Sequence, residues 1–175
     1  MADMFLMLEG IKGESLDQAK PIKHLDEIEI MNWSWLVKNP AKWQMGQQEA
    51  ASKADVDPIR IEKGYDRASV TLMQYCAMGK HIRSGKITCR KNAGGTKIDY
   101  LIIKLQEVMI KSVEWKGGHD PSPETVVLSF SKFEVEYTLQ PQPPENQSGT
   151  PQAQPSGPET TQFGFDINTH TAIAL

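Results

Sequence analysis

The sequence has few of the features that mark a metalloprotein, a disulfide-stabilised protein or a membrane protein. Its 175 residues include two cysteines, Cys76 and Cys89, which form neither a CxxC pair nor a metal-ligand spacing. No run of residues approaches the roughly 18 apolar residues of a membrane span. The formal net charge of −3 gives no electrostatic case for binding nucleic acid or a membrane surface. We therefore expect reduced thiols, no cofactor or metal, no nucleic acid and no membrane insertion.

Catalytic signatures are also lacking. His119 and Asp120 lie together in a turn-like stretch, and His24 lies beside Asp26 and Glu27 in another polar stretch. A metal or acid–base site needs further partners that the order of residues does not supply, so we interpret both groups as solvated loops. The segment NAGGTK lacks the spacing and the following helix of a phosphate loop, and it predicts a hairpin turn. We expect no enzymatic activity.

β-Branched and aromatic residues dominate several segments, which predicts a mainly β protein. The clearest segments are KITCRK, YLIIKLQEVMIKSVEW and TVVLSFSKFEVEYTL. The second is too long for one straight strand, so we expect it to bend near Gln106 and Glu107. A chain of 175 residues suits a single domain with one core.

Two segments change the face on which their apolar residues lie. In residues 26–35, the isoleucines occupy even positions, whereas Trp33 and Trp35 occupy odd positions. Residues 126–137 show the same change. Such a change indicates a β-bulge, or a strand whose two ends are buried against different surfaces. Both features are expected in a curved antiparallel barrel.

One helix is expected at about residues 66–82. Asp66 is suited to cap its N-terminus, and Gly79 is suited to end it. The apolar stripe that we expect to face the core contains Val70, Met73 and Ala77, joined by Leu72 and Cys76. With Trp33 and Trp35, this stripe forms the predicted structural core.

Acidic and basic residues are separated along the chain. The early acidic residues are Glu9, Glu14, Asp17, Asp26, Glu27 and Glu29, and the later basic residues are Lys80, Arg83, Lys86, Arg90, Lys91 and Lys97. One interpretation is an ordinary solvated surface. The other is a pair of unlike faces that meet head to tail when identical subunits or rings stack.

Several blocks, in this order, resemble the haemolysin-coregulated protein (Hcp) family, the tube subunit of type VI secretion. The blocks are MFLML (4–8), DEIEIMNWSW (26–35), YDRASVTLMQYCAMGKHI (65–82), KITCRKNAGGTKIDYLIIKLQEVMIKSV (86–113), VVLSFSKFEVEY (126–137) and FGFDINTH (163–170). The resemblance covers nearly the whole chain. One departure is residues 140–162, which are longer and richer in proline than the family usually shows.

The resemblance implies a structural protein. Its fold is a mainly β (α+β) domain, an antiparallel β-barrel built from two sheets with one flanking helix. Six copies would form a ring, and rings would stack into a hollow tube inside a contractile sheath, with a spike protein and a baseplate. The tube would be expelled into target cells and carry effector proteins in its lumen. The family assembles in the cytoplasm and is secreted without a cleaved signal peptide, and here Asp3 and Glu9 interrupt the apolar start.

The resemblance also suggests how the chain is divided. Residues 1–139 would form the tube domain, residues 140–162 a flexible Pro/Gln-rich segment, and residues 163–175 a strand that returns to the barrel. Six of the eleven prolines lie in the middle segment, which predicts a solvated linker.

Two groups of residues are candidates for contacts in the assembled tube. Successive side chains of a strand alternate between faces, so burial of Trp33 and Trp35 would turn Asn32 and Ser34 toward the lumen. An outer wall for these two residues stays an open alternative. The second group lies in residues 39–58, which show no periodicity, and consists of Trp43, Met45 and Gln47. We expect this loop to stack one ring on the next.

A different class of protein is also compatible with the sequence. A small secreted β-barrel could bind a carbohydrate or peptide on a surface made by Trp33, Trp35 and Trp115. That alternative predicts a monomer, so a mass measurement in solution separates it from the ring.

Overall fold

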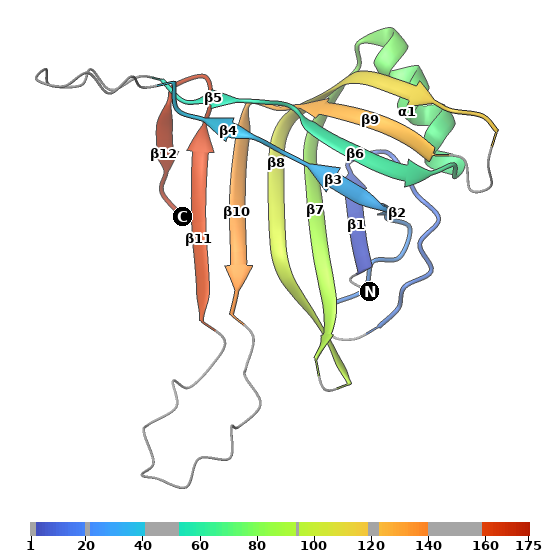
Figure 1. Ribbon diagram of the computed structural model, residues 1–175, viewed down its shortest axis with the longest axis horizontal. Coiled ribbons are helices and arrows are strands. Elements are labelled where there is room, and N and C mark those ends of the chain that lie inside the picture. Colours follow the sequence, from blue (N-terminus) through green and yellow to red (C-terminus); the bar gives the residue numbers. More distant parts are fainter. Residues whose placement is uncertain (1–2, 20–21, 41–52, 94, 119–122, 140–158) are drawn as a thin grey trace, which may run out of the picture.

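The structure is a computed structural model that describes residues 3–19, 22–40, 53–93, 95–118, 123–139 and 159–175 (Figure 1). These residues form twelve strands and one helix. The elements are β1 (Asp3–Leu8), β2 (Ile28–Glu29), β3 (Asn32–Ser34), β4 (Val37–Lys38), β5 (Asp55–Val56), β6 (Ile59–Gly64), α1 (Arg67–Met78), β7 (His81–Ala93), β8 (Thr96–Trp115), β9 (Pro123–Ser129), β10 (Lys132–Thr138), β11 (Thr160–Asp166) and β12 (Thr171–Ile173). The expected predominance of β structure is confirmed.

The long strand β8 organises the fold. It pairs with β7 along one edge, and on the other edge it pairs first with β10 and then with β9. The change of partner falls at Glu107, whose backbone φ is +55°. A positive φ is uncommon outside glycine and marks a sharp local change of direction. The bend expected near Gln106 and Glu107 is therefore confirmed.

Ten strands form one antiparallel array that branches at β8. The larger arm has the order β12-β11-β10-β8-β7-β1-β2, and the smaller arm runs from the second half of β8 through β9 and β6 to β3. The smaller arm crosses in front of the larger one in Figure 1. Among the named strands, β12 and β2 each pair along one edge only. The expected two-sheet barrel is present, but its ladder of hydrogen bonds is open.

The two arms enclose one hydrophobic core. Fully buried side chains come from both layers and from the helix, and they include Leu6, Ile28, Ile61, Leu72, Ile103 and Val126. Burying one such side chain is worth about 1.5–3 kcal/mol relative to leaving it in water. The core is therefore the main source of stability for a fold with a single helix in the described residues.

The two changes of apolar face arise where the chain passes from one arm to the other. β2 pairs with β1 in the larger arm, whereas β3 pairs with β6 in the smaller arm. In the same way, β9 belongs to the smaller arm and β10 to the larger one. Each predicted strand is thus two short strands, and its two ends are buried against different surfaces.

The helix has the predicted caps but not the predicted buried stripe. Asp66 accepts a hydrogen bond from the backbone of Ala68, and Gly79 ends the helix with a φ of +60°. Val70 is 69% exposed and Ala77 is exposed, while Met73 is half-buried. The assignment of Val70 and Ala77 to the core is wrong.

The residues that face the core lie on a neighbouring stripe of the helix, Ala68, Ser69 and Leu72. Ser69 donates a 2.6 Å hydrogen bond to the buried carboxylate of Glu124, so this side must face inward. With the Ser69 side of the helix facing inward, Val70 points outward. The sequence contains two overlapping apolar stripes, and their spacing alone does not decide between them.

The chain returns to the larger arm near its C-terminus. β11 pairs with β10 from Thr160 opposite Thr138 to Asp166 opposite Lys132. The ring of Phe165 lies 5.9 Å from the ring of Phe133, which belongs to the core. The helix of the described residues, with 12 residues, is too short to cross a membrane.

Candidate functional site

The first candidate surface is the polar outer face of the smaller arm. Residues that pair across neighbouring strands project from the same face of a sheet. One row contains Ser34, Arg60, Val127 and Ser112, and the next row contains Asn32, Glu62, Thr125 and Glu114. Six of these eight side chains are exposed; Val127 is half-buried and Thr125 is buried. The four strands therefore present a polar wall with no large exposed apolar side chain in either row.

The tryptophans next to Asn32 and Ser34 point to the opposite side of this wall. Trp33 and Trp35 are half-buried and pack against the hydrophobic core. The Trp35 indole donates a 3.0 Å hydrogen bond to the carbonyl of Asp57. The centres of the Trp35 and Phe133 rings lie 4.8 Å apart, and the two rings are nearly perpendicular. The two tryptophans are consequently held by the core, and the side chains of Asn32 and Ser34 stay on the wet face.

The tryptophan surface required by the carbohydrate or peptide alternative does not form. Trp33 and Trp35 contact the core, whereas Trp115 is 47% exposed at the end of β8. The Trp115 indole donates a hydrogen bond to Glu124 and lies edge-on to Tyr65. The candidate stacking residues Trp43, Met45 and Gln47 lie outside the described residues, as do His119 and Asp120.

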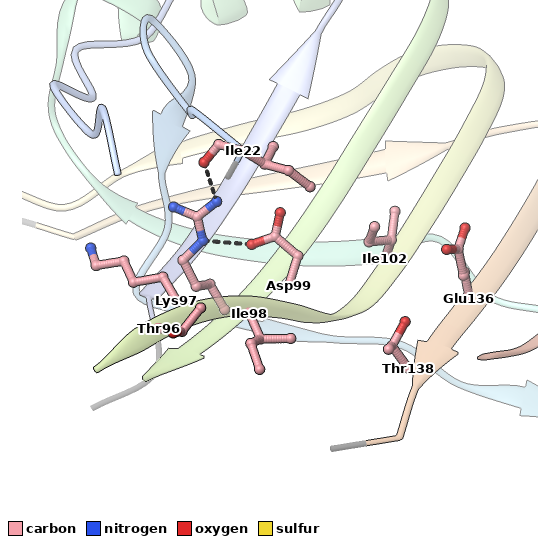
Figure 2. Close-up of a pocket in the computed structure, with 9 residues that line it drawn as sticks. Ile22, Thr96, Lys97, Ile98, Asp99, Ile102, Glu136 and Thr138 are labelled. Atoms are coloured by element: carbon pink, nitrogen blue, oxygen red, sulfur yellow. Dashed lines mark hydrogen bonds and ion pairs between the residues drawn. The ribbon is translucent and has the colours of Figure 1, made fainter. Parts of the chain in front are cut away.

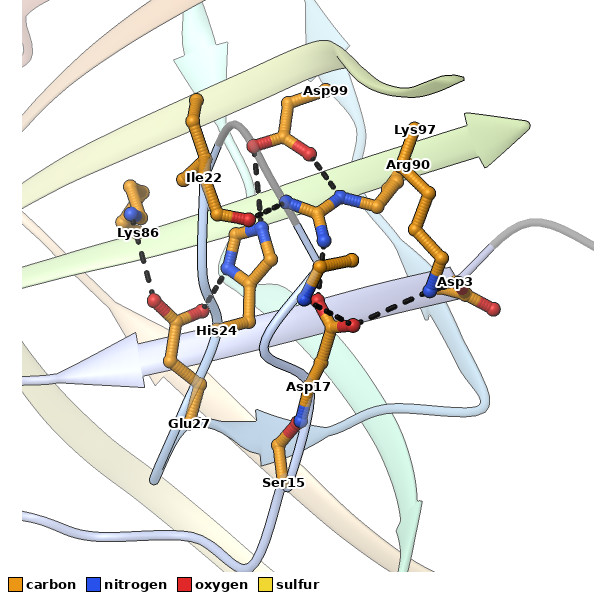
Figure 3. A network of polar contacts seen from close by, with 11 residues as sticks. Asp3, Ser15, Asp17, Ile22, His24, Glu27, Lys86, Arg90, Lys97 and Asp99 are labelled. Atoms are coloured by element: carbon orange, nitrogen blue, oxygen red, sulfur yellow. Dashed lines mark hydrogen bonds and ion pairs between the residues drawn. The ribbon is translucent and has the colours of Figure 1, made fainter. Parts of the chain in front are cut away.

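The second feature is a buried polar network on the larger arm (Figure 3). The Arg90 guanidinium, on β7, is 1% exposed and donates to Asp99 at 2.5 Å, to the carbonyl of Ile22 at 2.6 Å and to Asp17. The Arg90 guanidinium also lies 5.7 Å from the centre of the Phe5 ring. These contacts bind residues 15–19 and 22–27, here called the strap, to the outer face of β1, β7 and β8.

His24 is the second fastening point of the strap. Its side chain is fully buried, with Nδ1 2.8 Å from Glu27 and Nε2 3.2 Å from Asp99. Its ring stacks on Phe5 at a centroid distance of 4.3 Å. The expectation that His24 lies in a solvated loop is wrong. Its contact with Asp99 spans 75 residues of sequence, and the pattern around His24 gives no sign of it.

The network shifts the protonation equilibria of its members. Burial lowers the pKa of His24, but hydrogen bonds to Asp99 and Glu27 outweigh it, and the pKa is raised from its ordinary value. Burial raises the pKa of Asp99, but hydrogen bonds from His24 and Arg90 outweigh it, and the pKa is lowered. The arrangement therefore favours a protonated imidazole beside the ionised carboxylate of Asp99, which is a structural role.

A second buried network joins β6, β9 and the start of α1. Lys63 and Glu124 are both fully buried, and the Lys63 ammonium lies 2.8 Å from Glu124, 2.8 Å from Asp66 and 3.0 Å from Ser69. It also donates to the carbonyl of Gly64 at 2.7 Å. Four acceptors satisfy the three donors of the ammonium. The sequence contains a signal that Lys63 is buried, because it lies two residues after Ile61 and four after Ile59, on the buried face of the strand.

Three of the early acidic residues pair with later basic residues within the chain. Glu9 lies 3.8 Å from Arg83, and Glu27 lies 3.6 Å from Lys86. Asp17 bonds to Arg90 and lies 3.3 Å from Lys97. This happens because β1 and the strap lie alongside β7 and β8. Ion pairing within the chain therefore accounts for these charges without a second subunit.

Two depressions accompany the strap. A cavity of about 250 Å³ lies between Ile22 on the strap and Ile102 and Glu136 on the sheet (Figure 2). A larger groove of about 620 Å³ lies beside β1 and β2, with Leu16 and Met31 in its lining. Within the described residues, no three His, Cys, Asp or Glu side chains are grouped to hold a metal ion. Cys89 is buried and Cys76 half-buried, both as free thiols.

Comparison with known proteins gives consistent results over most of the chain. The family described as "Type VI secretion system effector, Hcp" matches residues 5–137. Protein hcp1 of Pseudomonas aeruginosa is 35% identical over 140 residues, which cover 79% of this chain and 84% of that protein.

Solved structures give the same picture. The crystal structure of Hcp1 from Salmonella typhimurium has a TM-score of 0.75 at 30% identity, covering 98% of this chain and 99% of that one. A structure described as a type six secretion system protein has a TM-score of 0.80 and covers 99% of this chain and all of that one. Its identity is 24%, so this second likeness bears on the fold alone.

Proposed function

Because the chain belongs to the Hcp family of type VI secretion proteins, we propose that it assembles into hexameric rings that stack into a hollow tube. As a member of that family it is a secreted tube subunit and a structural protein, not an enzyme. The match to the family in both sequence and fold is the observation that carries the proposal. The proposed partners are further copies of the chain, the contractile sheath, the spike protein, the baseplate and effector proteins in the lumen.

The ring is tested directly by mass and imaging. Sedimentation at micromolar concentration should give a species six times the 19.6 kDa mass of the chain, and negative-stain images should show rings. A single species of 19.6 kDa without rings would contradict the proposal. Mass spectrometry of secreted protein should find an intact N-terminus, because we propose export through the tube machinery without a cleaved signal peptide.

We propose that the polar wall of the smaller arm faces the lumen, with Asn32 and Ser34 as effector contacts. Exposed polar side chains keep their contacts with water when they face a wet channel, so this orientation costs little free energy. The neighbouring Trp33 and Trp35 pack against the core on the other side of the sheet. Ser34→Gln should leave ring assembly intact and weaken the retention of effectors that co-purify with the parent protein. Ser34→Ala is the matched control, because it removes the hydroxyl without adding bulk. Unchanged retention in Ser34→Gln rings would show that Ser34 is not a cargo contact.

We further propose that Trp43, Met45 and Gln47 stack one ring on the next. Tryptophan is common among interface anchors, and truncating such an anchor typically costs about 2 kcal/mol or more. A tube repeats each contact around the ring, so Trp43→Ala should shorten tubes at high protein concentration while sparing single rings. Tubes of normal length would place Trp43 against its own subunit, and broken rings would place it between neighbours within a ring.

The proposal also divides the chain by role. Residues 1–139 form the tube domain, and residues 163–175 complete the barrel. Of the expected Pro/Gln-rich segment (140–162), residues 140–158 lie outside the described residues, and β11 begins inside it at Thr160. The pairing of β11 with β10 supports the assignment of residues 163–175, because it adds the C-terminal residues to the larger arm.

A further inference from the structure

We propose that the polar wall of the smaller arm selects its cargo by two parallel rows of opposite charge. Acidic groups of the cargo lie against a cationic row that contains Arg60 and Lys111. Basic groups of the cargo lie against an anionic row that contains Glu62 and Glu114. The inference rests on the proposed lumen position of this wall, and it names the surface chemistry of the cargo.

The cationic row follows from the register of the strands. Arg60 on β6 pairs with Val127 on β9, which pairs in turn with Ser112 on β8. The register of β8 shifts at Lys111, which is the extra residue of a bulge beside Ser112. Ile110 is buried in the core and Lys111 is exposed, so the Lys111 ammonium lies on the wall side of β8. One strand therefore separates Arg60 from Lys111, which is a distance of about 10 Å across the sheet.

The anionic row lies beside the cationic row. Glu62 and Glu114 pair with Thr125 from its two sides, and both glutamates are exposed. Glu62 follows Arg60 by two residues, and Glu114 follows Ser112 by two residues. Side chains two residues apart on a strand project from the same face, about 7 Å from each other. The four charges thus mark a rough rectangle of about 7 by 10 Å, with like charges along each long side.

The charges of the wall are not neutralised by the part of the chain that the structure describes. Arg60, Glu62 and Lys111 have no ion-pair partner among those residues. Glu114 lies 3.4 Å from Lys116, but the two side chains are 54% and 57% exposed, and an ion pair exposed to this extent is weak. The four charged groups can therefore form ion pairs with a partner without first breaking a strong contact.

The outer face of the larger arm shows the opposite pattern. Lys104 lies 2.6 Å from Glu134 and 3.4 Å from Glu136 on the neighbouring strand. Lys132 lies 3.1 Å from Asp166 on the next strand. Charges on neighbouring strands pair with each other on that face, whereas the wall of the smaller arm keeps its charges in separate rows. This contrast marks the wall as the surface that can recognise a charged partner.

The wall is neutral as a whole, which limits the reach of its electric field. Its two rows contribute two positive and two negative charges. At physiological ionic strength, charges are screened over about 8 Å, which is close to the spacing of the rows. A cargo at a distance therefore meets no net attraction, whereas a cargo in contact meets both rows. The wall thus favours a cargo surface with acidic and basic side chains about 7 Å apart, whatever the net charge of the cargo. Each ion pair is weak, but the ring repeats the wall in every subunit.

Synthetic peptides test this preference on assembled rings. Three fluorescent peptides of about twelve residues have serine at every second position; the other positions hold alternating glutamate and lysine, glutamate alone, or lysine alone. In an extended chain, the alternating peptide places opposite charges about 7 Å apart, which matches the spacing of the two rows. In about 50 mM salt, fluorescence anisotropy should show that it binds parent rings at least fivefold more tightly than either single-sign peptide. Raising the salt to about 300 mM should remove most of this difference.

Neutral substitutions test whether the wall is the binding surface. The first variant combines Arg60→Gln, Glu62→Gln, Lys111→Gln and Glu114→Gln. It removes two cations and two anions, so the net charge of the chain is unchanged. It should form rings like the parent protein and bind the alternating peptide at least fivefold more weakly. The matched control is Lys23→Gln/Glu159→Gln, because both residues are exposed outside the wall and neither has an ion-pair partner among the described residues. The control should bind the peptide like the parent protein.

Contrary outcomes separate this inference from the proposals on which it rests. Equal binding of the three peptides to parent rings would overturn the inference and leave the ring proposal standing. Unchanged binding by rings of the glutamine variant would overturn it as well, since the site would lie elsewhere. A bead cannot enter the lumen, so capture of rings by the alternating peptide fixed directly to beads would place the wall outside the ring. In that case the lumen proposal fails together with the inference. If native mass shows that the parent protein forms no rings, the ring proposal itself fails, and this inference fails with it.

Discussion

Replacing Arg90 by methionine tests whether the buried network holds the strap on the sheet. The side chains of Arg90, Asp99 and Asp17 are 1%, 4% and 13% exposed. Methionine keeps most of the aliphatic volume, so the main loss is the positive charge between two carboxylates. Removing one partner of a buried ion pair costs about 3–5 kcal/mol, because the other charge stays buried without compensation. This is a large part of the roughly 5–15 kcal/mol that stabilises a typical protein.

Urea unfolding measures the effect at a fixed protein concentration. With a slope of about 2 kcal/mol per molar urea, the midpoint should fall by about 1.5–2.5 M. Trypsin should also cleave faster after Lys23, an exposed strap residue. Lys91→Met is the matched control, because Lys91 is the exposed neighbour of Arg90 and should change stability by less than about 0.5 kcal/mol.

The double variant Arg90→Met/Asp99→Asn separates charge from packing. It should recover part of the stability lost in Arg90→Met, since one uncompensated carboxylate is removed. A midpoint shift of less than about 0.5 M in Arg90→Met, with unchanged cleavage after Lys23, would refute the view that this network fastens the strap.

Three further predictions concern other parts of the described structure. The pKa of His24 is raised from its ordinary value of 6.5, so the protonated ring stabilises the fold fully below pH 6.5. This contribution is lost as the pH rises through the raised pKa of the folded state. Unfolding midpoints measured between about pH 6 and pH 9 should therefore fall in the parent protein and fall less in His24→Gln. Lys63→Met should cost about 3–5 kcal/mol in urea unfolding, because Glu124 stays fully buried without its cation, and Lys63→Met/Glu124→Gln should recover part of that loss. Gly13→Ala should lower thermal stability by about 1–3 kcal/mol, because its Cβ would lie 2.2 Å from the Glu27 carbonyl oxygen, whereas Gly64→Ala, with open space around its Cβ, should change little. A Gly13→Ala midpoint equal to that of Gly64→Ala would contradict the close packing of the strap.

The sequence predicts the features that depend on local pattern. The bend in β8, the helix caps at Asp66 and Gly79, and the two changes of apolar face follow from composition, spacing and parity within a few residues. Each of these signals is local, so it can be recognised from neighbouring residues alone, without information on tertiary contacts.

The features that the sequence does not reveal depend on partners that are distant in the chain. His24 is buried because Asp99 and Phe5 lie beside it, and neither is near it in sequence. The helix turns Val70 outward because Ser69 bonds to Glu124, which is 55 residues away. Glu9, Asp17 and Glu27 form ion pairs with later basic residues because two segments lie side by side in space. The polar face with Asn32 and Ser34 was expected from alternation, but Arg60 and Glu62 join it only through strand pairing.

The shared strand β8 has a mechanical consequence. A tube subunit is pushed by its neighbours, and the load on one layer of its barrel must reach the other. Here the load passes through the covalent backbone at Glu107, because the two halves of one strand belong to different layers. To slide the layers apart, a force would have to shear the ladders on both sides of β8 together, so the subunit is expected to yield as a whole and not by the separation of its sheets.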